Sequence, residues 1–378
     1  MQFLERNDLG RLLDALRAHD YEVIGPKIDQ EAIVYGSIES VDDLPHGWTE
    51  EQSAGKYRLK ERDDDCCFGF TVGPHSWKKY LFPPEVRLQT VKQGPRGWEF
   101  HDTVPPKKKL AFLGVRACEL AAIHIQDRIF QNEDYVDPHY RAHRKRALLI
   151  VVQCTMAAST CFCVSMGTGP KAEQGFDLGL TELEHGFLVE VGSDLGAEVI
   201  RTLPLRPVTD EERSTAEVWQ ARARQQKPMP ITAEAIRGKL LARLEHPHWQ
   251  DVAERCLSCA NCTLVCPTCF CHSVEEVSDL VHEEIHRDRH WDSCFNPDFS
   301  YISGGPIRST IRARYRQWLT HKLDSWQEQF ETSGCVGCGR CITWCPAGID
   351  LRDEVATLMH EDGPNDPTAN AKGSEVRS

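Results

Sequence analysis

The sequence predicts a multi-domain protein in which an α/β domain precedes a helical, cysteine-rich domain. Two observations predict this division. Residues 107–153 read as strand, helix and strand, which is typical of a parallel β-α-β unit. Eleven of the 17 cysteines lie beyond residue 255, and eight of these form two matched runs. At about 100–200 residues per domain, the length of 378 residues predicts two or three domains.

The N-terminal half supplies the elements of the α/β domain. We expect a helix over 8–19, strands over 21–26, 31–38, 107–115 and 146–153, a helix over 116–130, and a hairpin with a short helix over 178–202. Within the strands over 107–115 and 146–153, residues 110–115 and 147–152 are continuously apolar, as in a sheet that is covered on both faces. These elements predict an α/β domain over residues 1–202.

The composition restricts the class of protein. The 44 Lys and Arg against 57 Asp and Glu give a net charge of −13, which disfavours a nucleic-acid partner. No apolar run approaches the roughly 20 residues of a membrane span. The first residues carry charges and no apolar signal core, so we expect a cytoplasmic protein without a membrane partner. In that reducing compartment, clustered thiols indicate metal ligands rather than disulfides.

Two matched cysteine runs carry the strongest functional signal. Both have the pattern C-x2-C-x2-C-x3-C-P, which is typical of [4Fe–4S] ferredoxins, where the fourth cysteine ligates the other cluster. We therefore expect one cluster on Cys256, Cys259, Cys262 and Cys345, and a second on Cys335, Cys338, Cys341 and Cys266. Two zinc sites or eight free thiols are the alternative. The matched spacing, with proline after each run, favours clusters.

The chain between the two runs is too long for the compact βαββαβ ferredoxin. Residues 273–291 and 311–330 read as helices, and Ser273 with Glu276 has the spacing of a capping box. We therefore expect an all-helical dicluster domain over residues 233–361.

Two polar segments complete the predicted organisation. Residues 203–232 read as a charged helical linker, in which Thr209 and Glu212 have capping-box spacing. Residues 362–378 are rich in Gly, Pro, Asn and charge and are expected to be a disordered tail.

Four further cysteines predict a third cluster: Cys118, Cys154, Cys161 and Cys163. Cys118 begins the helix after one strand and Cys154 follows the next strand, so both should lie at the carboxyl edge of the sheet. A helix N-terminus also stabilises an anionic group. Buried structural thiols are the alternative interpretation for this set.

The remaining five cysteines receive no role: Cys66, Cys67, Cys269, Cys271 and Cys294. Cys269 and Cys271 extend the first run and are alternatives to Cys118. His282 to His286 matches H-E-x-x-H, but we interpret it as a solvated helix face. No G-x-G-x-x-G follows a strand and no acid–base pair is evident, so other proteins must deliver and remove the electrons.

Several segments resemble one known family. They are CLSCANCTLVCPTCFC (256–271), WDSCFNPDFSYISGGPIR (291–308), RARYRQWLTHKL (312–323), CVGCGRCITWCPAGID (335–350), GVRACELAAI (114–123) and SMGTGP (165–170). This chain resembles the iron–sulfur β subunit of cytoplasmic group 3b [NiFe] hydrogenases, or sulfhydrogenases, and the related A subunit of anaerobic sulfite reductase. The resemblance covers about residues 75–355. Ala117 and Glu119 stand where that family has Pro and Asp.

The resemblance implies a non-catalytic electron-transfer subunit of an oxidoreductase. Its partners would be a subunit that binds FAD and NAD(P) and the small and large [NiFe] hydrogenase subunits, or a sirohaem sulfite reductase subunit. The sequences of residues 316–323 and 339–346 resemble the hydrogenase version more closely. An iron–sulfur sensor or scaffold without a catalytic partner is the alternative of another class. The sequence does not decide whether the terminal electron acceptor is protons, polysulfide or sulfite. It also does not decide whether the nucleotide is NADP or NAD.

Overall fold

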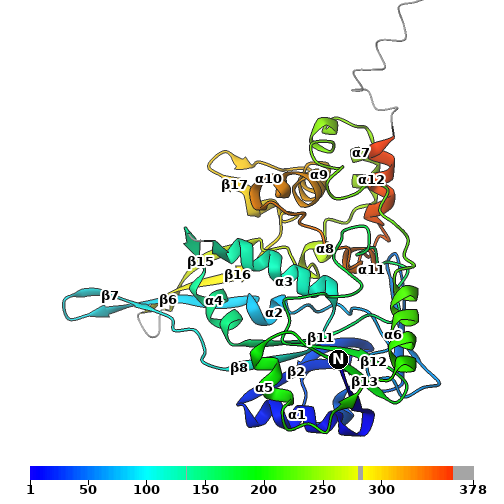
Figure 1. Ribbon diagram of the computed structural model, residues 1–378. Coiled ribbons are helices and arrows are strands. Elements are labelled where there is room, and N and C mark those ends of the chain that lie inside the picture. Colours follow the sequence, from blue (N-terminus) through cyan, green and yellow to red (C-terminus); the bar gives the residue numbers. More distant parts are fainter. Residues whose placement is uncertain (133, 280–283, 361–378) are drawn as a thin grey trace, which may run out of the picture.

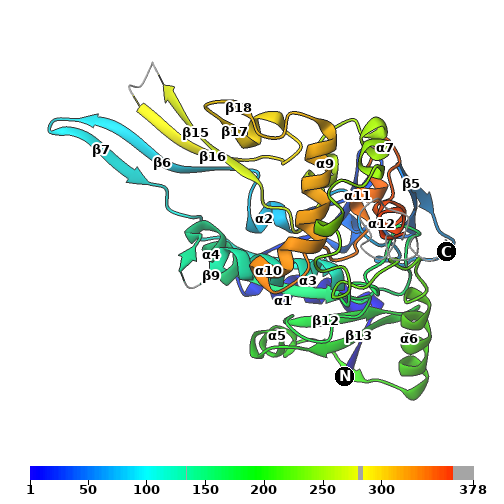
Figure 2. The same ribbon diagram turned by 90° about the horizontal axis from the view of Figure 1, so that it is seen from above.

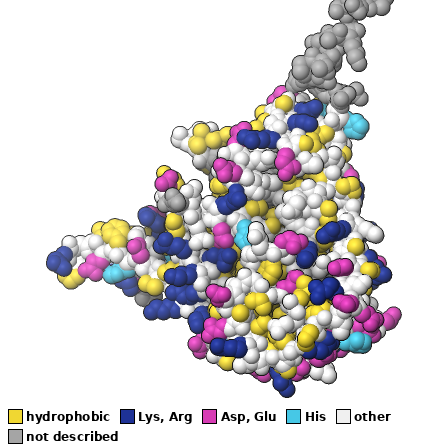
Figure 3. Space-filling model, viewed as in Figure 1, with side chains coloured by type: hydrophobic (Ala, Val, Ile, Leu, Met, Phe, Trp, Pro, Cys, Tyr) yellow, Lys and Arg dark blue, Asp and Glu magenta, His cyan; other side chains and the backbone are white. Residues whose placement is uncertain are grey.

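The computed structural model describes residues 1–132, 134–279 and 284–360. The α/β body lies at one end of the molecule, and the helices of the C-terminal half lie over it (Figure 1). A narrow β-sheet arm projects to one side in both ribbon views (Figures 1 and 2) and is built from β6 (Glu85–Gly94), β7 (Gly97–Asp102), β15 (His272–Asp279) and β16 (Glu284–Trp291). Although the net charge is −13, Lys and Arg side chains gather around the base of this arm (Figure 3).

The body is built on an eight-stranded sheet. Its order is β14 (Arg206–Pro207), β1 (Gln2–Glu5), β13 (Gly186–Val191), β12 (Leu178–Glu182), β11 (Ala147–Val152), β8 (Lys109–Val115), β2 (Tyr21–Asp29) and β3 (Ala32–Ser37). β8 pairs in parallel with both β2 and β11, and β11 pairs in parallel with β12. The predicted strand–helix–strand unit is therefore confirmed, with α3 (Ala117–Phe130) as its helix.

Helices cover both faces of this sheet. β11 alternates between two apolar cores: Leu148 and Ile150 pack with the leucines of α1 (Leu9–Ala18), whereas Leu149 and Val151 pack with Leu120 of α3. α5 (Asp194–Ile200) joins α1 on the first face, and α4 (Pro138–Lys145) joins α3 on the second. Full burial of each such side chain contributes about 1.5–3 kcal/mol. This explains why the strand is apolar throughout.

The segment expected to be a linker packs on the body. β14 adds an edge strand beside β1, so the sheet extends past residue 202. The expected helix is α6 (Asp210–Ala223), and the capping box of Thr209 and Glu212 is formed. Ala216 of α6 packs against Phe3 and Leu188 of the sheet.

Short helices dominate the region around the cysteine runs. They are α7 (His248–Arg255), α8 (Asn261–Leu264), α9 (Ile311–Thr320), α10 (Trp326–Phe330), α11 (Arg340–Thr343) and α12 (Leu351–Met359). α9, a π-turn (His321–Ser325) and α10 run consecutively, which confirms the predicted helix over 311–330. A separate core containing Trp249, Tyr315 and Trp318 packs these helices together.

The predicted helix over 273–291 is wrong, and so is the all-helical domain. β15 (His272–Asp279) and β16 (Glu284–Trp291) are strands, and β16 pairs with β6 (Glu85–Gly94), itself paired with β7 (Gly97–Asp102). The capping box is not used, because Ser273 Oγ donates to Asp292 Oδ2 (2.6 Å) and Glu276 pairs with Arg287. Cross-strand pairing with a distant segment overrides the local helical pattern. Figure 2 shows the strands of the resulting sheet extending away from the body.

A hairpin of the N-terminal half reaches the second cysteine run. β4 (Trp48–Ser53) and β5 (Lys56–Glu61) are joined at Gly55, whose backbone N–H donates to the carbonyl of Ile342 (3.0 Å). A Cβ on Gly55 would lie 2.9 Å from the carbonyl oxygen of Cys345, and its φ is +70°. Tyr57 stacks on Trp344 at 5.1 Å between ring centroids. The two halves of the chain therefore share this contact.

Smaller elements connect the larger ones. They are α2 (Lys78–Leu81), the hairpins β9–β10 (Gln131–Asn132, Tyr135–Val136) and β17–β18 (Tyr301–Ile302, Gly305–Pro306), and short 3-10 turns at Arg6–Asp8, Val41–Asp43, Leu241–Arg243 and Pro297–Ser300. No helix of the described residues is long and apolar enough to cross a membrane. The tail expected over 362–378 lies outside the described residues.

Candidate iron–sulfur sites

The two cysteine runs share one backbone conformation. In the first run Ser258 and Ala260 have φ of +52° and +66°, and in the second Gly337 and Gly339 have φ of +64° and +77°. A four-residue helix, α8 or α11, lies within each run and carries its third cysteine. In each run the N–H two residues after the first cysteine donates to its sulfur, at 3.4 Å on Cys256 and 3.5 Å on its counterpart. Each run therefore turns its thiols inward around a centre of its own, and the two runs do so in the same way.

The first predicted set surrounds a cavity near the surface. Its four thiols line this cavity: Cys256, Cys259, Cys262 and Cys345. Cys341 lines it as well, and Phe295, Tyr315 and Trp318 form an aromatic wall. The backbone N–H of Ile349 donates to Cys345 Sγ (3.4 Å). Cys259 is exposed, so this set is the most accessible to solvent of the three.

The second predicted set lies deeper. Cys266, Cys335 and Cys338 are buried, and the thiol of Cys341 lies within electrostatic reach of all three. Burial raises the pKa of the Cys335 thiol to about 12. Burial also acts on Cys266, but interactions with Cys269, the Lys322 ammonium and Thr268 lower its pKa well below the ordinary value. A thiolate at Cys266 therefore has nearby charge compensation.

The third predicted set gathers at the carboxyl edge of β8 and β11. Burial raises the pKa of Cys118, and the thiols of Cys163 and Cys154 act on it in the same direction. The Cys161 thiol interacts with these same two neighbours. The structure therefore brings all four side chains together. The Arg116 guanidinium lies beside Cys154 and donates to three backbone carbonyls, so a cation is fixed next to this set.

The second and third sets are neighbours. Cys338 lies within electrostatic reach of the thiols of Cys118 and Cys163. The backbone N–H of Phe162 donates to the carbonyl of Gly337 (2.9 Å), and a Cβ on Gly337 would lie 2.6 Å from the backbone nitrogen of Cys163. The second cysteine run is thus packed directly on the loop that carries the third set.

A buried ion pair joins the same two sets, and sequence reasoning missed it. Arg340, between two cysteines of the second run, pairs with Glu119, the residue after Cys118; both are almost fully buried. Arg340 also donates to the carbonyls of Gly73 (2.9 Å) and His75 (2.8 Å). The Glu119 carboxylate accepts further bonds from the side chains of Tyr35 and Trp77 and from the Arg116 N–H. The available signal in the sequence was a basic residue, Arg340, in one ligand segment and an acidic residue, Glu119, in the other.

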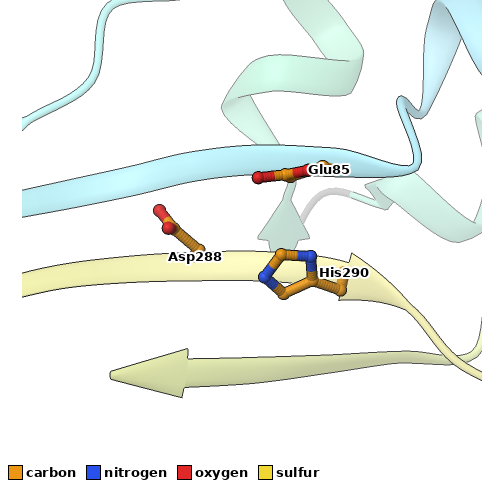
Figure 4. Close-up of side chains that lie close together, drawn as sticks. All are labelled: Glu85, Asp288 and His290. Atoms are coloured by element: carbon orange, nitrogen blue, oxygen red, sulfur yellow. The ribbon is translucent and has the colours of Figure 1, made fainter. Parts of the chain in front are cut away.

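The spacing of the thiols fits clusters better than single metal ions. Four thiolates on one zinc ion lie about 3.8 Å apart, given a Zn–S distance of about 2.3 Å. Among the described residues, the group of three ligand atoms found within 4.8 Å of one another is Glu85, Asp288 and His290 (Figure 4), and no group of three or more cysteines is so close. The Asp288 carboxylate is already paired with Arg87 (3.0 Å). The cysteine sets therefore have room for polynuclear groups.

The remaining candidates separate into two classes. Cys66 and Cys67 lie apart from all three sets; Cys67 faces His46, and burial raises the pKa of Cys66 to about 12. Cys269, Cys271 and Cys294 lie together and are considered below. Of the H-E-x-x-H motif, His286 belongs to strand β16, and residues 282–283 lie outside the described residues. The helix that this motif requires is not formed over residues 284–291.

Comparisons with known proteins agree with this chemistry. Residues 255–349 match the family described as 4Fe-4S dicluster domain. The sulfhydrogenase 2 subunit beta of Pyrococcus furiosus is 36% identical over 257 residues, which cover 65% of this chain and 74% of that relative. No solved structure matches. The chain therefore belongs to the family of sulfhydrogenase beta subunits, with a 4Fe-4S dicluster domain in its C-terminal half.

Proposed function

We propose that this protein is the electron-transfer subunit of a cytoplasmic [NiFe] hydrogenase, with no active site of its own. It would carry electrons between a partner that binds FAD and NAD(P) and the hydrogenase small and large subunits. The observation that carries this proposal is the arrangement of twelve cysteines in three adjoining sets that run from the surface into the α/β body. Family membership supports the hydrogenase partner.

Each set would hold one [4Fe–4S] cluster. The first would use Cys256, Cys259, Cys262 and Cys345, the second Cys335, Cys338, Cys341 and Cys266, and the third Cys118, Cys154, Cys161 and Cys163. The exposed Cys259 and the neighbouring Leu257, which is 66% exposed, make the first set the natural contact for a partner. The second set would connect the first to the third.

The protein's own groups would tune these clusters. Bound clusters supply one-electron chemistry and carry negative charge, and nearby cations and N–H···S hydrogen bonds make that charge less costly. Arg116 lies beside the third set, Arg340 between the second and third, and Lys322 beside Cys266. These fixed cations would favour the reduced state of the second and third clusters, and Arg314, which lies within electrostatic reach of Cys256, would act in the same direction on the first.

The test is purification of the tagged protein from its own host under anaerobic conditions. We expect co-purification of a nickel-containing pair and a flavin-containing chain. We also expect at least about twelve iron and twelve labile sulfide per chain, for three clusters. Hydrogen or NADPH should then reduce the clusters, as followed by EPR.

Three outcomes would contradict the proposal. Zinc without labile sulfide would exclude the clusters, and a sirohaem chain in place of nickel would point to sulfite reduction. Purification alone, with clusters that NADPH-fed partners cannot reduce, would favour a sensor or scaffold. A Cys154→Ser variant tests the third set separately, because its iron content and EPR spectrum should both change.

A further inference from the structure

Three cysteines outside the three sets gather around a separate cavity. Cys269, Cys271 and Cys294 line a cavity of about 270 Å³ between the end of the first cysteine run and helix α9. Two imidazoles, of His272 and His321, line the same cavity, and Phe270, Trp318 and Trp326 supply apolar walls. These thiols form neither of the matched patterns, so spacing alone assigns them no role.

The backbone holds these thiols at one place. The N–H of Asp292 donates to the carbonyl of Cys271 (2.9 Å), which fixes residues 269–271 beside residues 292–294. The Cys271 and Cys294 thiols interact directly, and Cys269 interacts with Cys266 of the second set. The cavity is therefore adjacent to the second set.

Two buried lysines face this group. Lys322 is 3% exposed, and its Nζ lies 3.6 Å from Cys269 Sγ and donates to Thr268 Oγ1 (3.0 Å) and the Gly334 carbonyl (2.9 Å). Lys78 is 4% exposed, and its Nζ donates to the Cys269 carbonyl (3.1 Å) and lies 3.8 Å from the ring centre of Trp291.

Each of these two buried ammonium groups needs a negative charge nearby to compensate it. Among the described residues, no ion pair joins either lysine to a carboxylate. A buried charge is costly unless an opposite charge compensates it. Cys266 of the second set and Cys269 lie within electrostatic reach of both lysines, and Lys78 Nζ otherwise contacts the Leu264 and Cys269 carbonyls and the face of Trp291. An anionic group bound to the three thiols would satisfy both lysines.

We infer that Cys269, Cys271 and Cys294 hold an additional iron–sulfur cluster, a branch beside the second set. The three thiols are not all within 4.8 Å of one another, so they are too widely spaced for one metal ion. His272 Nδ1 contacts the Phe270 carbonyl (3.1 Å) and His321 Nε2 contacts Gln329 Oε1 (2.9 Å), so the other ring nitrogen of each is left for the iron that receives no cysteine. The inference extends the proposed function by one site that its three sets do not include.

The decisive experiment counts iron and labile sulfide in the whole complex and in matched variants. The additional cluster raises the expected content from about twelve to about sixteen iron per chain if it is a cubane. A Cys271→Ala/Cys294→Ala double variant should lose about a quarter of the iron and one EPR signal, with the other signals unchanged. A Cys66→Ala/Cys67→Ala double variant is the control, because it removes two buried thiols away from the cavity, and its content should not change.

Several results would overturn this inference alone. They are about twelve iron in a native chain whose Cys154→Ser variant loses about a third of it, one zinc per chain that only the Cys271→Ala/Cys294→Ala variant loses, and a Cys271–Cys294 disulfide found by mass spectrometry of the native protein. The native count, read together with the Cys154→Ser variant, decides the question even if the double variant fails to fold. A native chain without iron would overturn the proposed function as well.

Discussion

The two cysteine runs have the same local structure but very different surroundings. Both place residues with positive φ before a four-residue helix, yet the first run uses Ser258 and Ala260 there and the second uses Gly337 and Gly339. The second run is packed on the loop over residues 160–163, where a Cβ on Gly339 would lie 2.5 Å from the Thr160 carbonyl oxygen. The first run has an exposed thiol, Cys259.

This difference separates what the motif dictates from what the fold adds. The spacing of the cysteines dictates how each run turns around its centre. Tertiary contacts decide whether the centre faces a partner or the protein interior. Five predictions test this separation, from the largest expected effect to the smallest.

The largest effect is expected from removing Cys345, the ligand that the second run contributes to the first set. Cys345 belongs to the second run in sequence but lines the cavity of the first set. Cys345→Ser should therefore remove the cluster of Cys256, with loss of about a third of the iron of the three sets and most electron transfer to the partner. Iron analysis and EPR measure this. Cys341→Ser is the matched comparison, and identical spectra for both variants would contradict crossed ligation.

The buried ion pair gives the next largest effect. Glu119→Gln leaves the Arg340 guanidinium without its carboxylate in a fully buried position. Such a change costs about 3–5 kcal/mol in the free energy of unfolding. Urea unfolding measures it. Glu51→Gln removes an exposed pair with Lys60 and should cost less than about 1 kcal/mol, so equal losses would argue against the role of the buried pair.

A side chain at Gly337 should disturb the junction between the second and third sets. Gly337→Ala costs about 1–2 kcal/mol for the positive φ. The new Cβ must also move the backbone of Cys163, 2.6 Å away. EPR signals of the second and third clusters should both shift, with the first unchanged. A change confined to the first cluster would contradict the packing.

Asp350 begins the helix that follows the second run, α12. Its carboxylate accepts from the Arg352 N–H (3.0 Å); although burial opposes this, the bonds from Arg352 lower the pKa of Asp350. A lowered pKa adds stability above the unfolded value near 4, which is lost as the pH falls through the folded pKa. Asp350→Asn should lower the free energy of unfolding by about 1 kcal/mol at pH 7. That difference should shrink below about pH 4 in urea titrations; a constant difference would exclude the ion pair as its cause.

The smallest effect is a gain. Ala260 holds a positive φ without the freedom of glycine. Ala260→Gly should therefore raise the free energy of unfolding by about 0.5–1 kcal/mol, because the strain of the left-handed conformation is removed. Thermal unfolding measures this gain. A loss of stability would mean that the Ala260 methyl group packs more favourably than its backbone is strained.

The sequence predicted those parts of the molecule that depend on local pattern. Continuous apolar strands such as β11 and the leucines of α1 indicated a covered parallel sheet, and the cysteine spacing indicated which thiols gather. The strands β15 and β16 were missed because their partner, β6, lies about two hundred residues earlier in the chain. Local spacing of Ser273 and Glu276 there imitated a helix start.

The missed site residues have a similar cause. Arg340, Lys322 and Lys78 read as ordinary charged residues within polar or cysteine-rich segments. Their burial depends on contacts with Gly73, Gly334 and Leu264, which come together only in the folded chain. A charge becomes informative only when its environment is known.

The contact between the hairpin at Gly55 and the second run bears on how the protein is made. Thr343 Oγ1 donates to Gln52 Oε1 across 291 residues, and Arg340 donates to the Gly73 carbonyl across 267. Contacts so distant in sequence form late in folding. A nascent chain therefore has to leave the ribosome at least as far as residue 345 before Cys345 can meet the first set. We therefore expect the clusters to be inserted after synthesis of the second run, when the N-terminal half is already present to contact it.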